Sequence, residues 1–427
     1  MTEEHPAARV AGRGTAVPLP DGQPFGARFR SWPDPGTTRA QVAGAGLSVL
    51  DLLLPAMALR QDALTHNAAL MARWCTQVGV ELAPHGKTAM SPELVRRQLD
   101  LGAWAITAAT TGQARTFASW GVPRILLANE VTDPGGLRWL GEAVAGGLDI
   151  LVLVDSPAAV RLLDEAMPAD ARIRALLEFG VPGGRAGVRT GELARAVAQA
   201  ATAATHVRLA GVECFEGVAG HDRSDTDTGA VTGMLDDFTA VVADLVTEGA
   251  FAGEDELLVT AGGSSYPDLV VEAFGRLELP ADLSVRMVLR SGGYLTHDHG
   301  LLERTSPMRA AGRHPLGRLQ PALCLFASVL STPEPGLAIV GFGKRDAPYD
   351  VDLPIPLRIC NRASGVAGVR VERLNDQHAF VAHDDTLQVG DVLEFGISHP
   401  CTAFDKWTLL PLLDGNDRVV DVVTTQF

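Results

Sequence analysis

From about residue 52, short apolar runs of strand length alternate with longer segments in which apolar positions recur at helical spacing. Each apolar run is followed by a helical segment or a loop. The runs lie at residues 80–85, 104–110, 124–131, 149–155, 173–180, 207–215, 256–262 and 285–292. Eight parallel strands with crossover helices most simply close into a barrel, so we predict an α/β protein with a (β/α)8 TIM barrel. An open, doubly wound sheet is the alternative fold.

After about residue 316 the helical spacing disappears, and apolar runs are separated by turns rich in Gly, Pro and Asp. We therefore predict a barrel domain over residues 52–315 and an all-β domain over residues 316–427. Residues 1–51 are rich in Pro, Gly and Arg and only weakly patterned, and we expect this segment to contribute to the β domain.

Composition and charge narrow the class of function. The 427-residue chain has a formal net charge of −15 at pH 7, which argues against a surface that binds nucleic acid or an anionic membrane. No apolar run approaches the roughly 18 residues of a membrane span, and the N-terminus lacks the apolar core of a signal peptide. The five cysteines are scattered and form no CxxC pair. We expect a cytoplasmic protein that acts on a small molecule.

Lysine is rare in this chain. Only three of its 36 basic residues are lysines, and Lys87 follows the first predicted barrel strand in the stretch ELAPHGKTAM. Chemistry in such barrels collects at the carboxyl ends of the strands. Arginine stays protonated, whereas a desolvated lysine can lose its proton and form a Schiff base with a carbonyl. Lys87 is therefore a candidate catalytic amine, and the alternative is a lysine on a surface loop.

Glycine-rich turns follow several predicted strands. TAGGSS (260–265) and RSGGY (290–294) come after the last two strands, where barrels often bind phosphate through backbone amides. Arg185 lies in another glycine-rich loop, EFGVPGGRAGVR, where a guanidinium could hold an anion or a phenolate. The alternatives are two ordinary tight turns and a surface arginine.

Two pairs of side chains are candidates for a metal site. His399 and Cys401 are two residues apart in ISHPCTAFDKW, so on a strand both would face the same side, and imidazole with thiolate suits zinc. An isolated His-x-Cys pair is more often part of the packing than a metal site. His297 and His299 in THDHG form a rival pair, in which Asp298 could orient one of the rings.

The stretch PHGKTAMSPELVRRQLDLGAWAITAATTGQA resembles the D-serine dehydratase and D-threonine aldolase family, whose members share the alanine racemase-like barrel. Members of that family carry a Pro-His-x-Lys-Thr element. The stretches ILLANEV, GGRAGV, TAGGSSYPDL, RSGGYLTHDHG and SHPCTAFDKW continue the resemblance in the same order. The resemblance covers about residues 52 to 410, and the combination of stretches is specific although each one alone is not.

The resemblance implies an enzyme that uses pyridoxal 5′-phosphate (PLP) and a divalent metal. It implies that Lys87 is the catalytic lysine that holds PLP, with His85 beside the cofactor, and that Arg185 faces its phenolic oxygen. It also implies that zinc, or another divalent metal, binds His399 and Cys401, and that the enzyme is a homodimer. The residues expected at the phosphate are Gly262, Gly263, Ser264, Gly292, Gly293 and Tyr294.

Three positions refine this interpretation. Met90 replaces the usual second basic residue after the lysine. Phe215 replaces a tyrosine near the pyridine ring, and a phenylalanine cannot hydrogen-bond the pyridine nitrogen. Cys401 matches the dehydratase branch, because aldolase-branch members tend to have aspartate at that position.

The combined interpretation is a PLP- and metal-dependent lyase for D-3-hydroxy amino acids. It would dehydrate and deaminate a D-serine- or D-threonine-like substrate to a 2-oxo acid and ammonia, with Lys87 as base and the metal as Lewis acid. The alternatives are a D-threonine-type aldolase that gives glycine and an aldehyde, an amino-acid racemase or epimerase, and a non-catalytic PLP-binding protein.

Overall fold

The computed structural model describes residues 22–26, 29–309, 312 and 314–427. These residues divide into two compact units, which we call the barrel unit and the β unit. The barrel unit contains residues 72–87 and 98–292. The β unit contains residues 88–97 together with the described residues before 72 and after 292. The chain therefore leaves the barrel unit at Lys87 and again at Gly292.

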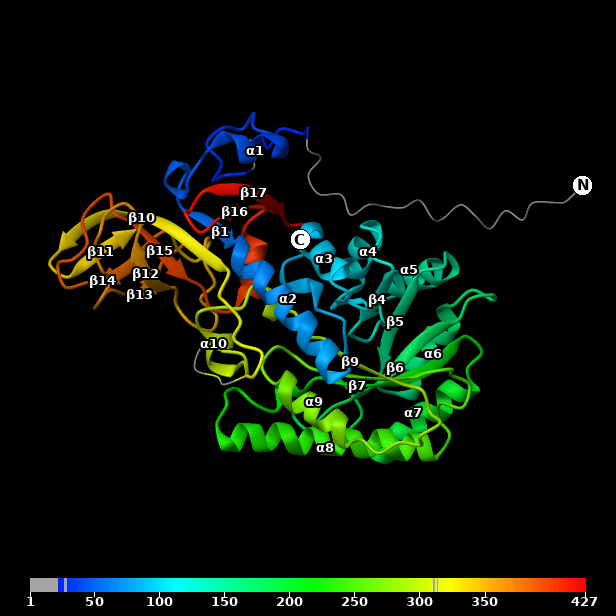
Figure 1. Ribbon diagram of the computed structural model, residues 1–427. Helices are drawn as coiled ribbons and strands as arrows, with labels where there is room; N and C mark the ends of the chain where they lie inside the picture. Colours follow the sequence, from blue (N-terminus) through cyan, green and yellow to red (C-terminus); the bar gives the residue numbers. More distant parts are fainter. Residues whose placement is uncertain (1–21, 27–28, 310–311, 313) are drawn as a thin grey trace, which may run out of the picture. The chain divides into compact units, whose positions relative to one another are not determined.

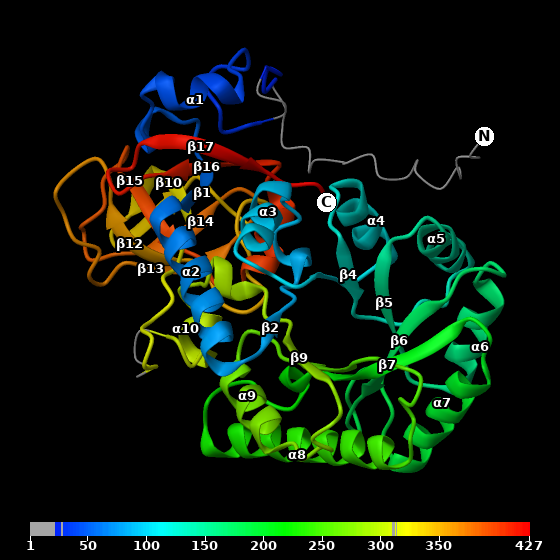
Figure 2. The same cartoon turned by 45° about the vertical axis from the view of Figure 1, so that its right-hand side comes forward.

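An eight-stranded parallel sheet forms the centre of the barrel unit, in the order β2-β9-β8-β7-β6-β5-β4-β3 (Figures 1 and 2). Its strands are β2 (Glu81–Leu82), β3 (Ile106–Ala108), β4 (Arg124–Leu127), β5 (Asp149–Val154), β6 (Ile173–Phe179), β7 (Val207–Cys214), β8 (Leu257–Ala261) and β9 (Val285–Leu289). A parallel bridge between His85 and Thr107 joins the segment after β2 to β3, which closes the order. The predicted barrel fold is confirmed, and each of the eight predicted strands is present.

Helices cover the outer side of the barrel strands, as Figure 2 shows for α4 to α7. The helices that alternate with the strands are α3 (Pro92–Asp100), α4 (Thr111–Ser119), α5 (Pro134–Ala145), α6 (Pro157–Ala166), α7 (Gly191–Ala203), α8 (Asp225–Thr247) and α9 (Pro267–Arg276). Many begin at a side-chain cap: Thr110, Ser156 and Thr190 each accept a hydrogen bond from the backbone amide three residues further on. These caps place each strand end and the loop after it in a defined position.

The β unit contains a nine-stranded sheet, in agreement with the β-rich C-terminal part that the sequence predicts. Its strands are β1 (Ala56–Arg60), β10 (Leu323–Glu334), β11 (Leu337–Val340), β12 (Ile355–Ile359), β13 (Arg370–Leu374), β14 (Ala379–Ala382), β15 (Val392–Gly396), β16 (Leu409–Leu413) and β17 (Val419–Thr424). The main order is β13-β14-β11-β10-β1-β16-β17, while β15 pairs with β10 and β12. Strand β1 precedes the barrel in the chain, yet Leu59 pairs with both Leu323 and Leu412.

The N-terminal part of the described chain packs onto this sheet. Phe25, Phe29 and Trp32 share one buried core with Phe326 and Val422 from the strands. The other helices are α1 (Arg39–Ala45), α2 (Gln61–Val78) and α10 (Leu301–Thr305). Of the N-terminal segment predicted to join the β domain, residues 1–21, 27 and 28 lie outside the described residues. Among the described helices, none has both the length and the apolar character needed to cross a membrane.

A network of arginine and carboxylate side chains crosses the β sheet. Arg60 contacts Glu394 at 2.6 Å and Asp417 at 2.5 Å, and Arg358 contacts the same two carboxylates at 2.6 and 2.7 Å. Burial raises the pKa of Glu394, but Arg60 and Arg358 outweigh burial and hold it below the ordinary value. Each acid of this network therefore faces two cations.

Candidate active site

Lys87 lies in a short 3-10 turn, Gly86–Thr88, directly after the segment that closes the barrel. Side chains of the barrel unit pack tightly against this turn. A Cβ atom at Gly86 would lie 2.6 Å from the Phe117 ring and 2.9 Å from the Ile106 side chain, so only glycine fits there. The Lys87 side chain is partly buried. Because the backbone on both sides of Lys87 is fixed, its amine starts from a defined position at the carboxyl end of β2.

His85 is next to this amine. Its Nδ1 atom is buried and has no hydrogen-bond partner among the described residues. Burial lowers the pKa of His85, and the positive charges of Lys87, Arg290 and Arg185 lower it further. His85 is therefore a neutral imidazole that can accept or share a hydrogen bond with a ligand.

Four glutamates gather at the carboxyl ends of the neighbouring strands, and the pKa values of three of them are raised. Burial raises the pKa of Glu178 to about 10, with further contributions from Glu213 and from a hydrogen bond to Glu130. Burial also raises the pKa of Glu213, against the opposing effect of Arg290. Burial likewise raises the pKa of Glu216. This part of the barrel is consequently a low-dielectric region that favours protonated carboxyl groups.

Arg290 is the buried cation of this region. Its guanidinium pairs with Glu213 at 2.6 Å and donates to the Thr260 hydroxyl at 3.1 Å and the Cys214 carbonyl at 2.8 Å. The side chain is only 4% exposed. Sequence reasoning missed this pair, although Arg290 opens the RSGGY stretch and Glu213 lies two residues before Phe215. The available signal was a charged residue inside each apolar strand run, which is unusual unless the charge is paired.

Arg185 lies over the Phe215 ring, with its guanidinium carbon 4.6 Å from the ring centroid. This cation–π contact holds both side chains at the barrel end without a hydrogen bond. Glu178 and Glu213 are close enough for Arg185 to lower their pKa values. The sequence-predicted anion-binding arginine therefore lies in the same region as Lys87, Arg290 and the glutamates.

In the first glycine turn, other side chains of the protein occupy the space beside the backbone. Gly262 has a φ of +106°, which favours glycine, and the Gly263 amide donates a hydrogen bond to Glu216 Oε1 at 2.8 Å. A Cβ atom at Gly263 would lie 2.8 Å from the Phe215 ring. The amide that the sequence predicts for phosphate is thus satisfied by a carboxyl group. Ser264, the third residue predicted there, follows in the same turn.

The second glycine turn packs against His85. A Cβ atom at Gly292 would lie 2.6 Å from the His85 carbonyl oxygen, so the close approach requires glycine. The Ser291 hydroxyl donates to the Gly263 carbonyl at 2.6 Å and so connects the two turns. The remaining predicted residues, Gly293 and Tyr294, begin a 3-10 turn in the β unit, and Tyr294 is buried.

In the β unit, His399 and Cys401 lie on a short strained loop. His399 has a φ of +55°, in the left-handed region that non-glycine residues rarely adopt. Its Nδ1 atom lies 2.5 Å from Asp350 Oδ2. A hydrogen bond with the Cys401 side chain raises the pKa of His399 to about 9, and Asp350 adds to this shift. The structure therefore brings the two predicted metal ligands together and adds Asp350, which the sequence did not reveal.

The Cys401 sulfur also contacts the segment that carries the catalytic lysine candidate. Thr88 Oγ1 lies 3.4 Å from Cys401 Sγ, and Thr88 is the residue that follows Lys87 in the chain. The contact belongs to the β unit, which begins again at Thr88.

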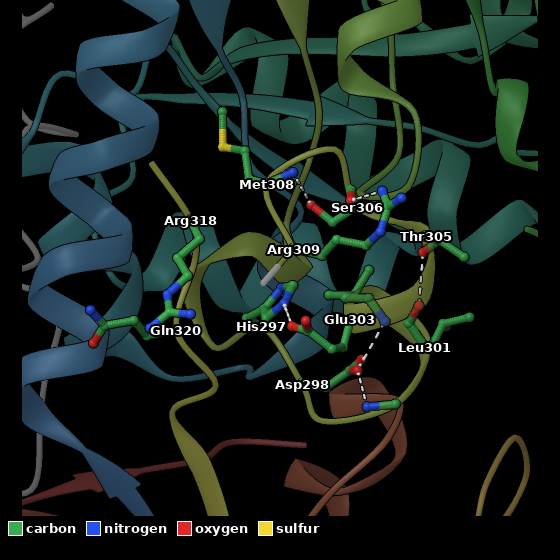
Figure 3. A network of polar contacts seen from close by, with 12 residues as sticks. His297, Asp298, Leu301, Glu303, Thr305, Ser306, Met308, Arg309, Arg318 and Gln320 are labelled. Atoms are coloured by element: carbon green, nitrogen blue, oxygen red, sulfur yellow. Dashed lines mark hydrogen bonds and ion pairs between the residues drawn. The ribbon is translucent and has the colours of Figure 1, made fainter. Parts of the chain in front are cut away.

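In the rival histidine pair, His297 has a carboxylate partner and the neighbouring Asp298 holds backbone amides. His297 Nε2 lies 3.1 Å from Glu303 Oε2, and Asp298 accepts hydrogen bonds from backbone amides (Figure 3). His299 packs against Gly396, where a Cβ atom would lie 2.4 Å from its ring. Within the part of the chain that the structure describes, no three His, Cys, Asp or Glu side chains are grouped so as to hold a metal.

Comparison with known proteins matches two parts of the chain. Residues 59–265 match the family model for the alanine racemase N-terminal domain, and residues 322–413 match the model for a putative serine dehydratase domain. The chain is thus similar to fold-type III PLP enzymes of the alanine racemase type.

Several of the proteins that it resembles are named as aldolases or dehydratases. A D-threonine aldolase from Arthrobacter sp is 28% identical over 357 residues, which cover 82% of this chain and 86% of the relative. The crystal structure of D-threonine aldolase from Filomicrobium marinum superposes with a TM-score of 0.76 at 26% identity, covering 89% of this chain and 97% of that one. D-threo-3-hydroxyaspartate dehydratase from Delftia sp. HT23 shares the fold, with a TM-score of 0.71 at 21% identity over 89% of this chain and 99% of that one.

The residues at the barrel end fit the PLP of this family. PLP is an anionic aromatic aldehyde, and the region offers an amine at Lys87, guanidinium groups at Arg185 and Arg290, and the flat face of Phe215. The unpartnered Nδ1 of His85 is an additional buried polar atom that needs a ligand. Lys87 could hold the aldehyde.

The chemistry of the His399 and Cys401 side chains fits a divalent metal of intermediate softness such as zinc. Asp350 occupies Nδ1 of His399, which leaves Nε2 for a metal. Two protein ligands would leave coordination positions open for a substrate.

Proposed function

We propose that this protein is a PLP- and zinc-dependent lyase that converts a D-3-hydroxy amino acid, similar to D-serine or D-threonine, into a 2-oxo acid and ammonia. The observation that carries this proposal is the contact of 3.4 Å between Thr88 Oγ1 and Cys401 Sγ. Thr88 and Cys401 both belong to the β unit, and Thr88 directly follows Lys87 in the chain. An enzyme that eliminates hydroxide from a β-carbon needs both an amine base and an acid for the hydroxyl.

In this proposal Lys87 accepts the α-proton of the substrate and Arg185 binds the phenolic oxygen of the cofactor. Bound PLP supplies the electron sink that stabilises negative charge at the α-carbon. Neutral His85 holds the Lys87 amine without competing for its proton. Gly262, Gly263, Ser264, Gly292, Gly293 and Tyr294 are the residues that we assign to the phosphate.

His399 and Cys401 would hold the zinc ion. Bound zinc supplies Lewis acidity to the substrate hydroxyl, which is otherwise a poor leaving group. A cysteine-to-alanine variant of D-threo-3-hydroxyaspartate dehydratase is known in a metal-free form, which supports a cysteine at the metal of that protein. The elimination step releases one water molecule, and hydrolysis of the amino group consumes one. The net products are therefore one 2-oxo acid and one ammonia.

Aldol cleavage is the second candidate function, and the relatives favour it. D-threonine aldolase from Arthrobacter sp and 3-hydroxy-D-aspartate aldolase from Paracoccus denitrificans are both aldolases, at 28% and 25% identity. An aldolase would use the same amine and metal but remove the hydroxyl proton and break the bond between the α- and β-carbons. Cys401 is the residue that favours dehydration, because it matches the dehydratase branch that the chain resembles, whereas aldolase-branch members tend to have aspartate at that position.

The test is a product assay of the PLP-loaded full chain with D-serine and D-threonine, with and without a chelator. We expect 2-oxo acid and ammonia that disappear on chelation and return with added zinc. Aldehyde and glycine would assign the aldolase reaction instead. A product that forms equally in chelator would contradict the role of the metal.

The role of Lys87 has a matched control within the chain. We expect Lys87→Ala to lose the covalently held cofactor, so that borohydride treatment no longer fixes PLP to the protein. Lys344→Ala removes an equivalent charge in the β unit, where Lys344 lies 5.4 Å from the centre of the Tyr349 ring, and should leave the cofactor in place. Cofactor fixed at another residue in the Lys87→Ala variant would contradict the assignment.

We also propose that the enzyme is a homodimer, as the resemblance implies. Light scattering of the purified, PLP-loaded chain should give twice the mass of one 45.0 kDa chain. A monomer that turns over substrate would contradict this.

A further inference from the structure

Several side-chain contacts hold the loop that carries His399. Asp350 binds the His399 ring through Nδ1 at 2.5 Å, and its second oxygen accepts a hydrogen bond from the Thr402 hydroxyl at 2.9 Å. Both oxygens of one carboxylate therefore contact the same loop, on either side of Cys401. Such a bidentate arrangement fixes the carboxylate as well as the ring that it contacts.

A second carboxylate holds the backbone of the same residue. Asp298 Oδ2 accepts the His399 amide at 3.3 Å, while Asp298 Oδ1 accepts the amides of Gly300 and Leu302 at 2.8 and 2.9 Å. Asp298 is fully buried. The THDHG motif thus supports the His399 loop.

These contacts explain how His399 can keep its unusual backbone conformation. A non-glycine residue at a φ of +55° is strained, and it persists only where its surroundings hold it. Asp298 restrains the amide and Asp350 restrains the ring, so the direction of Nε2 is set from both ends. Strained backbone of this kind is concentrated at sites that bind ligands.

We infer that Asp350 is a positioning residue for the metal site: it fixes the tautomer and orientation of His399 so that Nε2 faces the metal beside Cys401, while Asp298 fixes the backbone of the loop. This inference rests on the proposed function, because it assumes that His399 and Cys401 bind zinc. Carboxylates that orient metal-binding histidines typically change metal affinity by about 10–100-fold when removed.

The test measures zinc affinity of the PLP-loaded full chain after chelator treatment, by competition with a chromophoric chelator, together with metal content by mass spectrometry. Asp350→Asn keeps a side-chain oxygen that can accept from Nδ1, so we expect a loss in affinity of about 10-fold. Asp350→Ala removes the acceptor and should lose about 100-fold. Asp376→Asn is the matched control, because Asp376 is 75% exposed and makes only a long ion pair with Arg345.

The melting temperature of the zinc-free protein separates positioning from general stability. Asp350 is partly exposed, so we expect both of its variants to melt within a few degrees of the parent when zinc is absent. Unchanged zinc affinity in Asp350→Ala would overturn the inference. An equal loss in Asp350→Asn and Asp350→Ala would also overturn it, because that pattern indicates direct binding of the metal by the carboxylate. If the parent chain itself binds no divalent metal, the proposed function fails rather than the role of Asp350.

Discussion

Glu213 in the barrel unit and Glu394 in the β unit are alike in almost every local respect, yet their pKa values shift in opposite directions. Each is nearly fully buried, and each has an arginine nitrogen 2.6 Å from a carboxylate oxygen. Burial raises the pKa of both. Glu394 faces two arginines, Arg60 and Arg358, and its pKa ends below the ordinary value. Glu213 faces Arg290 and lies near other glutamates, and its pKa ends above it.

The comparison indicates that one directly paired arginine, even with Arg185 nearby, does not offset complete burial beside Glu130 and Glu216, whereas two directly paired arginines offset the burial of Glu394. In the β unit the charges are balanced, and the acids stabilise the sheet as ionised groups. At the barrel end carboxyl groups outnumber the buried arginines, so the pKa values of Glu178, Glu213 and Glu216 lie above their ordinary value. Perturbed groups that are not neutralised locally are concentrated at functional sites, because a ligand or substrate supplies the missing charge. The barrel end fits that description and the β-sheet network does not.

The largest effect should come from removing the single arginine. Arg290→Met removes the direct ion-pair partner of buried Glu213, and breaking a buried pair in this way costs about 3–5 kcal/mol in the free energy of unfolding. Denaturant unfolding monitored on the PLP-loaded chain measures it. The double variant Arg290→Met/Glu213→Gln should recover part of the loss, because it removes the orphaned charge. A loss below about 1 kcal/mol in the single variant would show that Glu213 is already neutral in the parent.

A smaller loss of stability is expected where two arginines pair with the same carboxylates. In Arg60→Met, Arg358 still pairs with Glu394 and Asp417, so the cost should be about 2 kcal/mol, as for loss of hydrogen bonds to charged groups. The same unfolding experiment measures it. If Arg60→Met lowered the free energy of unfolding as much as Arg290→Met does, a second paired arginine would not protect the carboxylate, and the explanation would be wrong.

Glu178→Gln should stabilise the protein. The pKa of Glu178 is raised to about 10, so the folded protein holds its proton at pH 7 while the unfolded chain releases it. Unfolding is therefore favoured by rising pH, and glutamine removes this effect without changing the shape of the side chain. We expect a gain of about 1 kcal/mol at pH 7 that grows toward pH 9 and vanishes near pH 4. A gain that does not change with pH would refute this explanation.

The smallest effect is a shift in acid unfolding that belongs to the β unit. The folded pKa of Glu394 lies below its ordinary value of 4.5, so this group contributes stability above that pH and loses it as the pH falls through the lowered pKa. Arg60→Met reduces the difference between folded and unfolded pKa values. Its acid-unfolding midpoint, followed by circular dichroism, should move to higher pH by roughly half a unit relative to the parent. A midpoint at lower pH would contradict the sign of the pKa shift.

Local patterns in the sequence were sufficient for the elements whose signals are local. The eight barrel strands and the start of α3 at Pro92, after Ser91, follow from apolar runs and helix caps. Strands β12 and β16 were not recognised, because Pro356 and Pro411 interrupt them and proline normally argues against a strand. Strand β1 was missed because its partners lie far away in the sequence.

The residues of the candidate site also divide into those with a local signal in the sequence and those without one. Lys87, Arg185 and the glycine turns could be selected by residue type and by their place after a strand. The contacts of Arg290 with Glu213 and of Asp350 with His399 join residues from different strands or loops, 77 and 49 positions apart. The pKa shifts of the glutamates depend on burial and on mutual distance, which a single sequence does not specify.

The position of β1 between β10 and β16 has a consequence for folding while the chain is being synthesised on the ribosome. Leu59 emerges early, but its partner Leu323 is synthesised about 260 residues later. At roughly 5–20 residues per second, the nascent chain must carry this apolar strand unpaired for on the order of 10–50 s. Throughout that interval Ala56–Arg60 is a free strand edge that other chains can pair with, so the segment is an expected binding site for ribosome-associated chaperones and the place where co-translational aggregation would begin.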